Sequence, residues 1–213
     1  MKQVLNADDC REIIYHIADK ITENKDYLTE LDSAIGDGDH GIGMVGGLQK
    51  ACEKLKQMSD MDDAYLVFSM TGKAMLMTMG GASGVVFSSM FLAGTRNKPS
   101  QPELSAVDLT NMFTDGLSAI KEKGHAKVGD KTMVDALEPA ITAMKNYNGN
   151  NITEMLGLAV KAALDGLEST ENMIARIGRS KSLMERAVGH KDAGAASVWI
   201  IFKSMHEWLC DND

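Results

Sequence analysis

Apolar residues recur along this chain at the three- and four-residue spacing of an α-helix. One run reads Ile13, Ile14, Ile17, Ala18 and Ile21, and this spacing places the five side chains on one helical face. No segment alternates apolar and polar residues over the length of a useful strand. Aromatic residues make up only 5% of the 213 residues, and there are three prolines, which favours helix over sheet. The chain is therefore predicted to be all-α.

The apolar spacing predicts about eight amphipathic helices in a single domain that spans residues 1–213. The first is expected to begin at Asp8 or Asp9, and an acidic loop separates it from the second. The run 198–202 is apolar enough for a strand, but it has no candidate partner, so it is predicted to be a core helix. Helices that bury one face each would gather their end loops at one rim. The helices are expected near residues 9–21, 40–58, 62–77, 85–91, 105–124, 133–144, 153–167 and 193–209.

The acidic loop, residues 31–43, contains Asp32, Asp37 and Asp39 together with His40 and four glycines. Three carboxylates this close repel one another unless a cation lies between them. The glycines allow sharp turns, so the side chains can converge. All-oxygen ligands suit a hard cation, and the calcium EF-hand is excluded because its glycine and closing glutamate are missing. The loop predicts a Mg²⁺-phosphate site, with a solvated acidic turn as the alternative.

Two further glycine-rich segments precede predicted helices. Residues 80–84 read GGASG, and residues 124–132 resemble a Walker A motif with Asp130 inserted before Lys131. Neither segment follows a strand, so the P-loop interpretation is rejected. Backbone N–H groups at such helix starts can still receive a phosphate, and Ser83 adds a hydroxyl. A tight turn between helices is the alternative for residues 80–84, and a core position is the alternative for Met133, which directly follows the second segment.

A basic segment precedes the last predicted helix in a chain whose net charge is −8. Its arginines are Arg176, Arg179 and Arg186, and arginine beside a helix N-terminus suits a nucleotide phosphate. Solvated surface charge is the alternative. The overall negative charge argues against nucleic acid or an anionic membrane as partner.

The cysteines and the N-terminus predict a cytoplasmic protein. The three cysteines, Cys10, Cys52 and Cys210, are far apart and odd in number, so they indicate neither a disulfide framework nor a zinc site. No apolar run approaches the ~18 residues of a membrane span, and the polar N-terminus lacks the apolar region of a signal peptide.

Several motifs, in this order, resemble those of one kinase family. They are Leu31-Asp-x-x-Ile-Gly-Asp-Gly-Asp-His-Gly, Gly80-Gly-x-Ser-Gly, Val128-Gly-Asp-Lys-Thr-Met-Val-Asp-Ala-Leu137, Ala175-Arg-x-Gly-Arg179 and Gly189-His-x-Asp-x-Gly194. Over nearly its whole length the chain resembles subunit L, the nucleotide-binding subunit of dihydroxyacetone kinases. The resemblance implies a barrel of eight antiparallel helices with the nucleotide at one end.

The resemblance also implies the residues of the site. Two Mg²⁺ ions would be held by Asp32, Asp37 and Asp39. Arg179 is carried over from the family, with Arg176 and Arg186 as alternatives, and Ala193 stands where the family commonly has proline. The residues that would contact ADP or ATP are His40, Gly41, Ile42, Gly43, Ala82, Ser83, Gly124, Thr132, Met133, Arg179, Asp192, Ala193 and Gly194.

The implied activity is phosphoenolpyruvate-dependent dihydroxyacetone kinase, carried out only with partner subunits. ADP, bound like a prosthetic group, would be recharged in place by phosphocarrier subunit M. Its γ-phosphate would then pass to dihydroxyacetone on subunit K, and no residue of this chain is expected to act as a covalent catalyst. A homodimer is also expected. The alternatives are a kinase domain with another acceptor, such as a fatty acid, and a nucleotide sensor that binds a transcription regulator.

Overall fold

The computed structural model describes residues 2–58 and 62–212, except for the Arg179 side chain. It is almost entirely helical, as predicted. The described α-helices are α1 (Ala7–Glu23), α2 (Lys25–Ile35), α3 (His40–Lys56), α4 (Ala64–Thr78), α5 (Gly81–Thr95), α6 (Ala106–Gly124), α7 (Val134–Asn146), α8 (Ile152–Ser169) and α9 (Ala193–Asp211). Two short 3₁₀ segments, Thr170–Asn172 and Arg179–Ala187, follow α8. No helix within the described ranges is long and apolar enough to cross a membrane.

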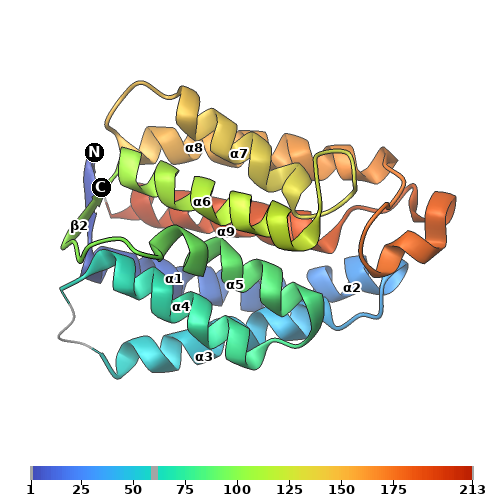
Figure 1. Cartoon of the computed structure of the whole chain (residues 1–213), viewed down its shortest axis with the longest axis horizontal. Helices are drawn as coiled ribbons and strands as arrows, with labels where there is room; N and C mark the ends of the chain where they lie inside the picture. The colour runs from blue at the N-terminus through green and yellow to red at the C-terminus, as the bar shows by residue number, and fades with distance from the viewer. Residues whose placement is uncertain (1, 59–61, 213) are drawn as a thin grey trace.

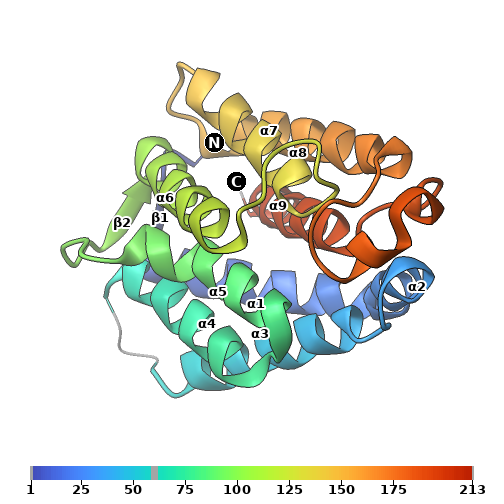
Figure 2. The same ribbon diagram turned by 45° about the vertical axis from the view of Figure 1, so that its right-hand side comes forward.

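Eight of these helices form a closed ring. Each packs against the next in the order α1, α3, α4, α5, α6, α7, α8 and α9, and α9 packs back against α1. Figures 1 and 2 show the ring from two directions. This arrangement confirms the predicted barrel of about eight helices.

Helix α2 was not predicted, because the sequence placed a loop directly after the first helix. It lies outside the ring, against α3 and α9. Leu28 and Ile35 are buried among its 11 residues, and Tyr27 and Leu31 pack against the core, so α2 has an apolar face that the sequence-based prediction did not use. The prediction that all three aspartates lie in one loop is wrong: Asp32 lies on the last turns of α2, and Asp37 and Asp39 lie in the loop that follows.

The first helix also begins earlier than expected. Asn6 is its N-cap and accepts a hydrogen bond from the N–H of Asp9, while the Asp9 side chain accepts from the N–H of Asn6. Asp9 is therefore the fourth residue of a capping box and not the cap. Ser105 and Asp108 make the same box at the start of α6, as the sequence predicted.

Both capping boxes follow short strands that the sequence did not predict. Strand β1 (Val4–Asn6) pairs antiparallel with β2 (Glu103–Ser105). Leu5 lies opposite Leu104, and both are fully buried. Three residues are too few for an alternating pattern to stand out. The strand pair closes the end of the barrel where both termini lie (Figure 1).

The inside of the ring is filled with apolar side chains. Phe113 of α6 and Phe202 of α9 meet across it with ring centroids 5.1 Å apart, and burying such a side chain contributes about 1.5–3 kcal/mol. Phe202 ends the apolar run 198–202, which is helical as predicted. Gly116 lets α5 and α6 approach closely, because an added Cβ would lie 2.4 Å from the Met90 carbonyl oxygen.

Four connections between helices meet at the end of the barrel opposite the termini. They join α2 to α3, α4 to α5, α6 to α7, and α8 to α9 (Figure 1). The glycine-rich, acidic and basic segments of the sequence lie in these connections or at the helix ends beside them.

Candidate functional site

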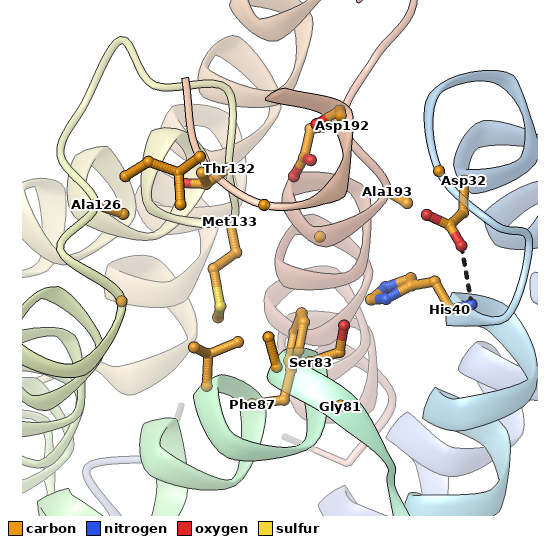
Figure 3. A pocket seen from close by; sticks show the side chains of 18 of the residues that line it. Asp32, His40, Gly81, Ser83, Phe87, Ala126, Thr132, Met133, Asp192 and Ala193 are labelled. Atoms are coloured by element: carbon orange, nitrogen blue, oxygen red, sulfur yellow. Dashed lines mark hydrogen bonds between the residues drawn. The ribbon is translucent and has the colours of Figure 1, made fainter. Parts of the chain in front are cut away.

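A cavity of about 430 Å³ opens at this end of the barrel, and all four connections line it. Figure 3 shows the Asp32 and His40 side chains on one side and Ala126, Thr132 and Met133 on the other. Ser83 and Phe87 of α5 lie below, and Asp192 lies above. The predicted site residues among its lining are Asp32, Asp37, Asp39, His40, Ala82, Ser83, Gly124, Thr132, Met133, Asp192, Ala193 and Gly194.

The three aspartates converge at one edge of the cavity. Asp32, Asp37 and Asp39 each offer a carboxylate oxygen, and these atoms lie within 4.8 Å of one another. Asp32 is half-buried and its Oδ2 accepts a hydrogen bond from the N–H of His40 at 3.2 Å. A set of only carboxylate oxygens at this spacing fits Mg²⁺, which keeps further positions for water and phosphate oxygens.

Two glycines allow this convergence. A Cβ on Gly36 would lie 2.2 Å from the Asp32 Oδ1 atom, so a larger residue would displace that carboxylate. Gly38 has φ of +77°, a conformation that favours glycine. A Cβ there would also lie 2.5 Å from Ser33 Oγ. The short acidic loop therefore depends on both glycines to hold its shape.

His40 begins α3 and lies between the acidic cluster and the inside of the barrel. It is 6% exposed, and its Nε2 lies 2.8 Å from Ser197 Oγ on α9. Its ring centroid is 5.5 Å from that of Phe87. Burial lowers the pKa of His40, although Asp32 and a hydrogen bond with the Ala193 backbone act in the opposite direction. The ring is held in place by residues of α5 and α9.

The N-terminus of α5 forms the floor of the cavity. Its N-cap is Gly80, so no side chain accepts hydrogen bonds from the first N–H groups of the helix. Gly81 has φ of +67°, and the Ser83 hydroxyl lies at the same helix start, beside the cavity (Figure 3). Uncapped N–H groups and the positive end of the helix dipole attract an anion such as a phosphate.

One end of the cavity is apolar. Met133 extends into the cavity from one wall and Phe87 rises into it from α5 (Figure 3), and both are buried. Val86, Ile120 and Ala126 complete this apolar end. A flat aromatic ring fits between such side chains, because methionine and phenylalanine both pack well against aromatic faces.

Buried carboxylates hold the α6–α7 connection, and Asp135 makes the contacts next to the cavity wall. Asp135 accepts hydrogen bonds from the N–H of Gly129 at 2.6 Å and of Thr132 at 2.7 Å. Desolvation raises the pKa of Asp135, and these two hydrogen bonds lower it. Gly129 has φ of +96°, so the turn needs a glycine there. Asp135 thereby fixes the position of Thr132 and Met133 in the cavity wall.

Asp192 closes the site from the opposite side as the N-cap of α9. Its Oδ1 accepts a hydrogen bond from the N–H of Ala195 at 2.7 Å. Desolvation, with contributions from Asp135 and Asp32, raises the pKa of Asp192 to about 7. Ala193 and Gly194 follow at the cavity wall, so this segment lies at the site.

The remaining predicted residues lie outside the cavity lining. Gly41 is buried against α2, where an added Cβ would lie 2.5 Å from both Lys25 O and Thr29 Oγ1. Ile42 is 59% exposed, and Gly43 donates its N–H to Asp39 O within the α3 N-terminus. The contacts predicted for these three residues stay predictions.

Of the three arginines, the structure describes the side chains of Arg176 and Arg186. Arg176 and Arg186 are exposed and are not among the lining residues. The Arg179 side chain lies outside the described part of the chain, although the neighbouring Gly178 and Ser180 line the cavity.

Sequence reasoning missed several residues of the site. Phe87, Lys131 and Asp135 belong to it, and Ser197 supports it from α9. Lys131 and Asp135 lie inside the motif 128–137, so their polar character in an apolar helix start was an available signal. Phe87 and Ser197 lie in apolar helical runs and gave no such signal.

Comparison with known proteins agrees with this geometry. Residues 34–207 match the family model of the DAK2 domain. The chain is 36% identical over 191 residues to "PEP-dependent dihydroxyacetone kinase 2, ADP-binding subunit DhaL" of Listeria innocua, covering 89% of this chain and 88% of that protein. It is 34% identical to the ADP-binding subunit DhaL of Escherichia coli, covering 88% and 90%.

A solved structure shares the fold. The dihydroxyacetone kinase from C. freundii, in complex with AMP-PNP and Mg²⁺, superposes with a TM-score of 0.73 and 26% identity. The match covers 92% of this chain but only 33% of that longer one. The chain therefore belongs to the DAK2-domain family, and ADP-binding DhaL subunits match it over most of their length.

Proposed function

We propose that this chain is the ADP- and ATP-binding subunit of a PEP-dependent dihydroxyacetone kinase. One observation carries the proposal: three carboxylates within 4.8 Å of one another adjoin an uncapped helix start and an apolar recess in the same cavity. These three parts match the metal-phosphate tail and the flat base of a nucleotide. The names of the similar DhaL proteins and the AMP-PNP and Mg²⁺ in the C. freundii kinase support it.

The residues present fit two magnesium ions. Asp32, Asp37 and Asp39 would hold them, since three carboxylates supply enough negative charge and only oxygen ligands. Bound magnesium supplies neutralisation of the charge on the transferred phosphoryl group. The chain's own contribution is to orient the nucleotide: the N-terminus of α5 receives phosphate oxygens, and Met133 with Phe87 holds the base.

The arrangement leaves the terminal phosphate at the open end. His40 is paired with Ser197 Oγ, but Ser197 is fully buried and is not among the described residues that line the cavity, so this pair does not present a nucleophile to a substrate. The acceptor, dihydroxyacetone, would therefore be presented by a second protein, subunit K, and ADP would be recharged by phosphocarrier subunit M. Exposed apolar side chains near this end, such as Ile42 and Met77, which is 87% exposed, offer a contact surface for such partners.

Native mass spectrometry of the purified chain tests the proposal directly. We expect a bound mass equal to one ADP and two magnesium ions, lost after treatment with a chelator. With ATP and dihydroxyacetone alone the chain should form no dihydroxyacetone phosphate, and adding subunit K should start transfer. Absence of nucleotide binding with Mg²⁺ present would refute the proposal. The homodimer, the transcription regulator, the single domain and the cytoplasmic location stay predictions.

A further inference from the structure

Lys131 is a buried charged residue for which the proposed function has no use. It is 1% exposed and lies directly before Thr132 and Met133 in the cavity wall. Lysine is almost never fully buried unless its ammonium group is paired. Its burial here therefore needs an explanation.

The Lys131 ammonium group joins two other segments of the site. Its Nζ donates to Thr170 O at 2.5 Å and to His190 O. Thr170 follows the last turn of α8, where the helix dipole is negative, and His190 lies in the connection before α9. This side chain thereby joins its own segment to two others, which lie 39 and 59 residues further along the chain.

The surrounding contacts extend this junction to the cavity. Thr170 Oγ1 accepts a hydrogen bond from the N–H of Asp192 at 3.0 Å, and Asp192 caps α9. Desolvation lowers the pKa of Lys131, and the nearby carboxylates of Asp192, Glu171 and Asp135 act in the opposite direction. The charge is therefore compensated by two carbonyls and three acidic groups.

The backbone of Lys131 is also in an unusual conformation. Its φ is +62°, in the left-handed region that costs a residue with a Cβ roughly 1–2 kcal/mol. A glycine would avoid this cost but could make neither contact of the ammonium group. The strained backbone is consistent with a side chain whose contacts compensate for it.

We propose that Lys131 is a positioning residue of the nucleotide site: it clamps the wall that carries Thr132 and Met133 to the wall that carries Asp192 and Ala193. This inference rests on the proposed function and deepens it. Lys131 sets the width of the recess for the base, and it acts through these neighbours without itself touching the metal cluster.

The test compares three variants of the full chain. Lys131→Met removes the donor, Lys131→Arg keeps charge and donors, and Lys121→Met is the matched control, since Lys121 pairs with Glu138 at the surface. Calorimetry with Mg²⁺ should show ADP affinity weakened about tenfold or more in Lys131→Met, because two hydrogen bonds to a charged group are lost. Lys131→Arg should restore most of that affinity, and Lys121→Met should match the unaltered chain.

Two further readouts separate positioning from general stability. Mn²⁺ binding without nucleotide, followed by electron paramagnetic resonance, should be unchanged in Lys131→Met. Amide hydrogen exchange should become faster around residues 188–192 and not in the core of α6 or α9. Unchanged ADP affinity together with unchanged exchange in Lys131→Met would overturn the inference.

If Lys131→Met does not fold, chemical labelling of the lysines in the unaltered chain tests whether the Lys131 ammonium group is held in its buried contacts. Under reductive methylation Lys131 should react far more slowly than Lys121, and added ADP should slow it further. Equal rates at the two lysines would overturn the inference. Failure of the unaltered chain to bind ADP would refute the proposed function instead, and in that case exchange and labelling without nucleotide still report on the clamp.

Discussion

His40 Nε2 lies 2.8 Å from Ser197 Oγ, so the first residue of α3 is tied to α9 across the inside of the barrel. Both residues are buried. The bond fixes the end of the helix whose preceding loop carries Asp37 and Asp39. The acidic cluster is therefore positioned from inside the barrel as well as by its own glycines.

Replacing Ser197 with alanine should destabilise the fold, because His40 Nε2 would lose its partner in a buried place. An unsatisfied buried polar group costs about 1–3 kcal/mol. Ser204→Ala is the matched control: Ser204 is also buried on α9, but its hydroxyl donates only to Ile200 O of its own helix. Urea unfolding should show the larger loss of free energy for Ser197→Ala. Equal losses would mean that the bond with His40 contributes nothing of its own.

The raised pKa of Asp192 predicts that the free energy of unfolding depends on pH. Its pKa is raised from 3.8 to about 7 in the folded chain, so between these values the folded state binds more protons than the unfolded state. The stability contributed by this group is then fully present below about pH 4 and is lost as pH rises through about 7.

The Asp192→Asn variant isolates this effect, since asparagine also caps helices but does not titrate. Urea unfolding of both proteins without nucleotide should show the stability of the unaltered chain falling, relative to Asp192→Asn, as pH rises from 4.5 to 8. Parallel curves would show that Asp192 keeps an ordinary pKa.

The acidic cluster predicts that metal binding can be removed without loss of the fold. Asp37 is exposed, so Asp37→Asn should unfold at a similar temperature while binding neither Mn²⁺ nor Mg·ADP at the affinity of the unaltered chain. Asp26→Asn is the control, because it makes the same charge change at an exposed position at the other end of α2. Normal ADP binding by Asp37→Asn would contradict the assignment of the site.

A substitution of Met133 distinguishes the contribution of the base to binding from that of the phosphates. Met133→Ala should weaken binding of ADP about five- to tenfold, since about 1 kcal/mol or more of apolar contact with the base is removed. Binding of Mg²⁺-pyrophosphate, which has no base, should stay unchanged, whereas Asp37→Asn should weaken both. Equal weakening of ADP and pyrophosphate by Met133→Ala would place the base elsewhere.

Part of this site could be predicted from sequence because its residues are close together along the chain. Asp32, Asp37 and Asp39 fall within eight residues with glycines between them, so their chemistry is visible before any fold is known. Phe87 could not be predicted as a site residue, because its place in the cavity depends on how α5 packs in the ring. Helix α2 was missed because its acidic residues were assigned to a loop, although Leu28 and Ile35 give it a buried face.

The sequence and the structure suggest different roles for Gly41. The sequence motif suggests a contact with phosphate, but the structure places Gly41 where α3 crosses α2, with Lys25 O and Thr29 Oγ1 each 2.5 Å from an added Cβ. Gly41→Ala should therefore push α2 away from α3, shift Asp32 on α2, and cost about 1–3 kcal/mol of stability, as overpacking does.

Gly46→Ala, on the same helix, is the control. An added Cβ there meets only Thr78 Cγ2 at 3.9 Å, so alanine should stabilise the helix by about 0.5–1 kcal/mol through its higher propensity. Thermal unfolding should therefore move in opposite directions in the two variants, and Mn²⁺ affinity should fall only in Gly41→Ala. If Gly41→Ala keeps its stability and its Mn²⁺ affinity yet loses ADP binding, then Gly41 contacts the phosphate directly, and the helix crossing is not what requires glycine.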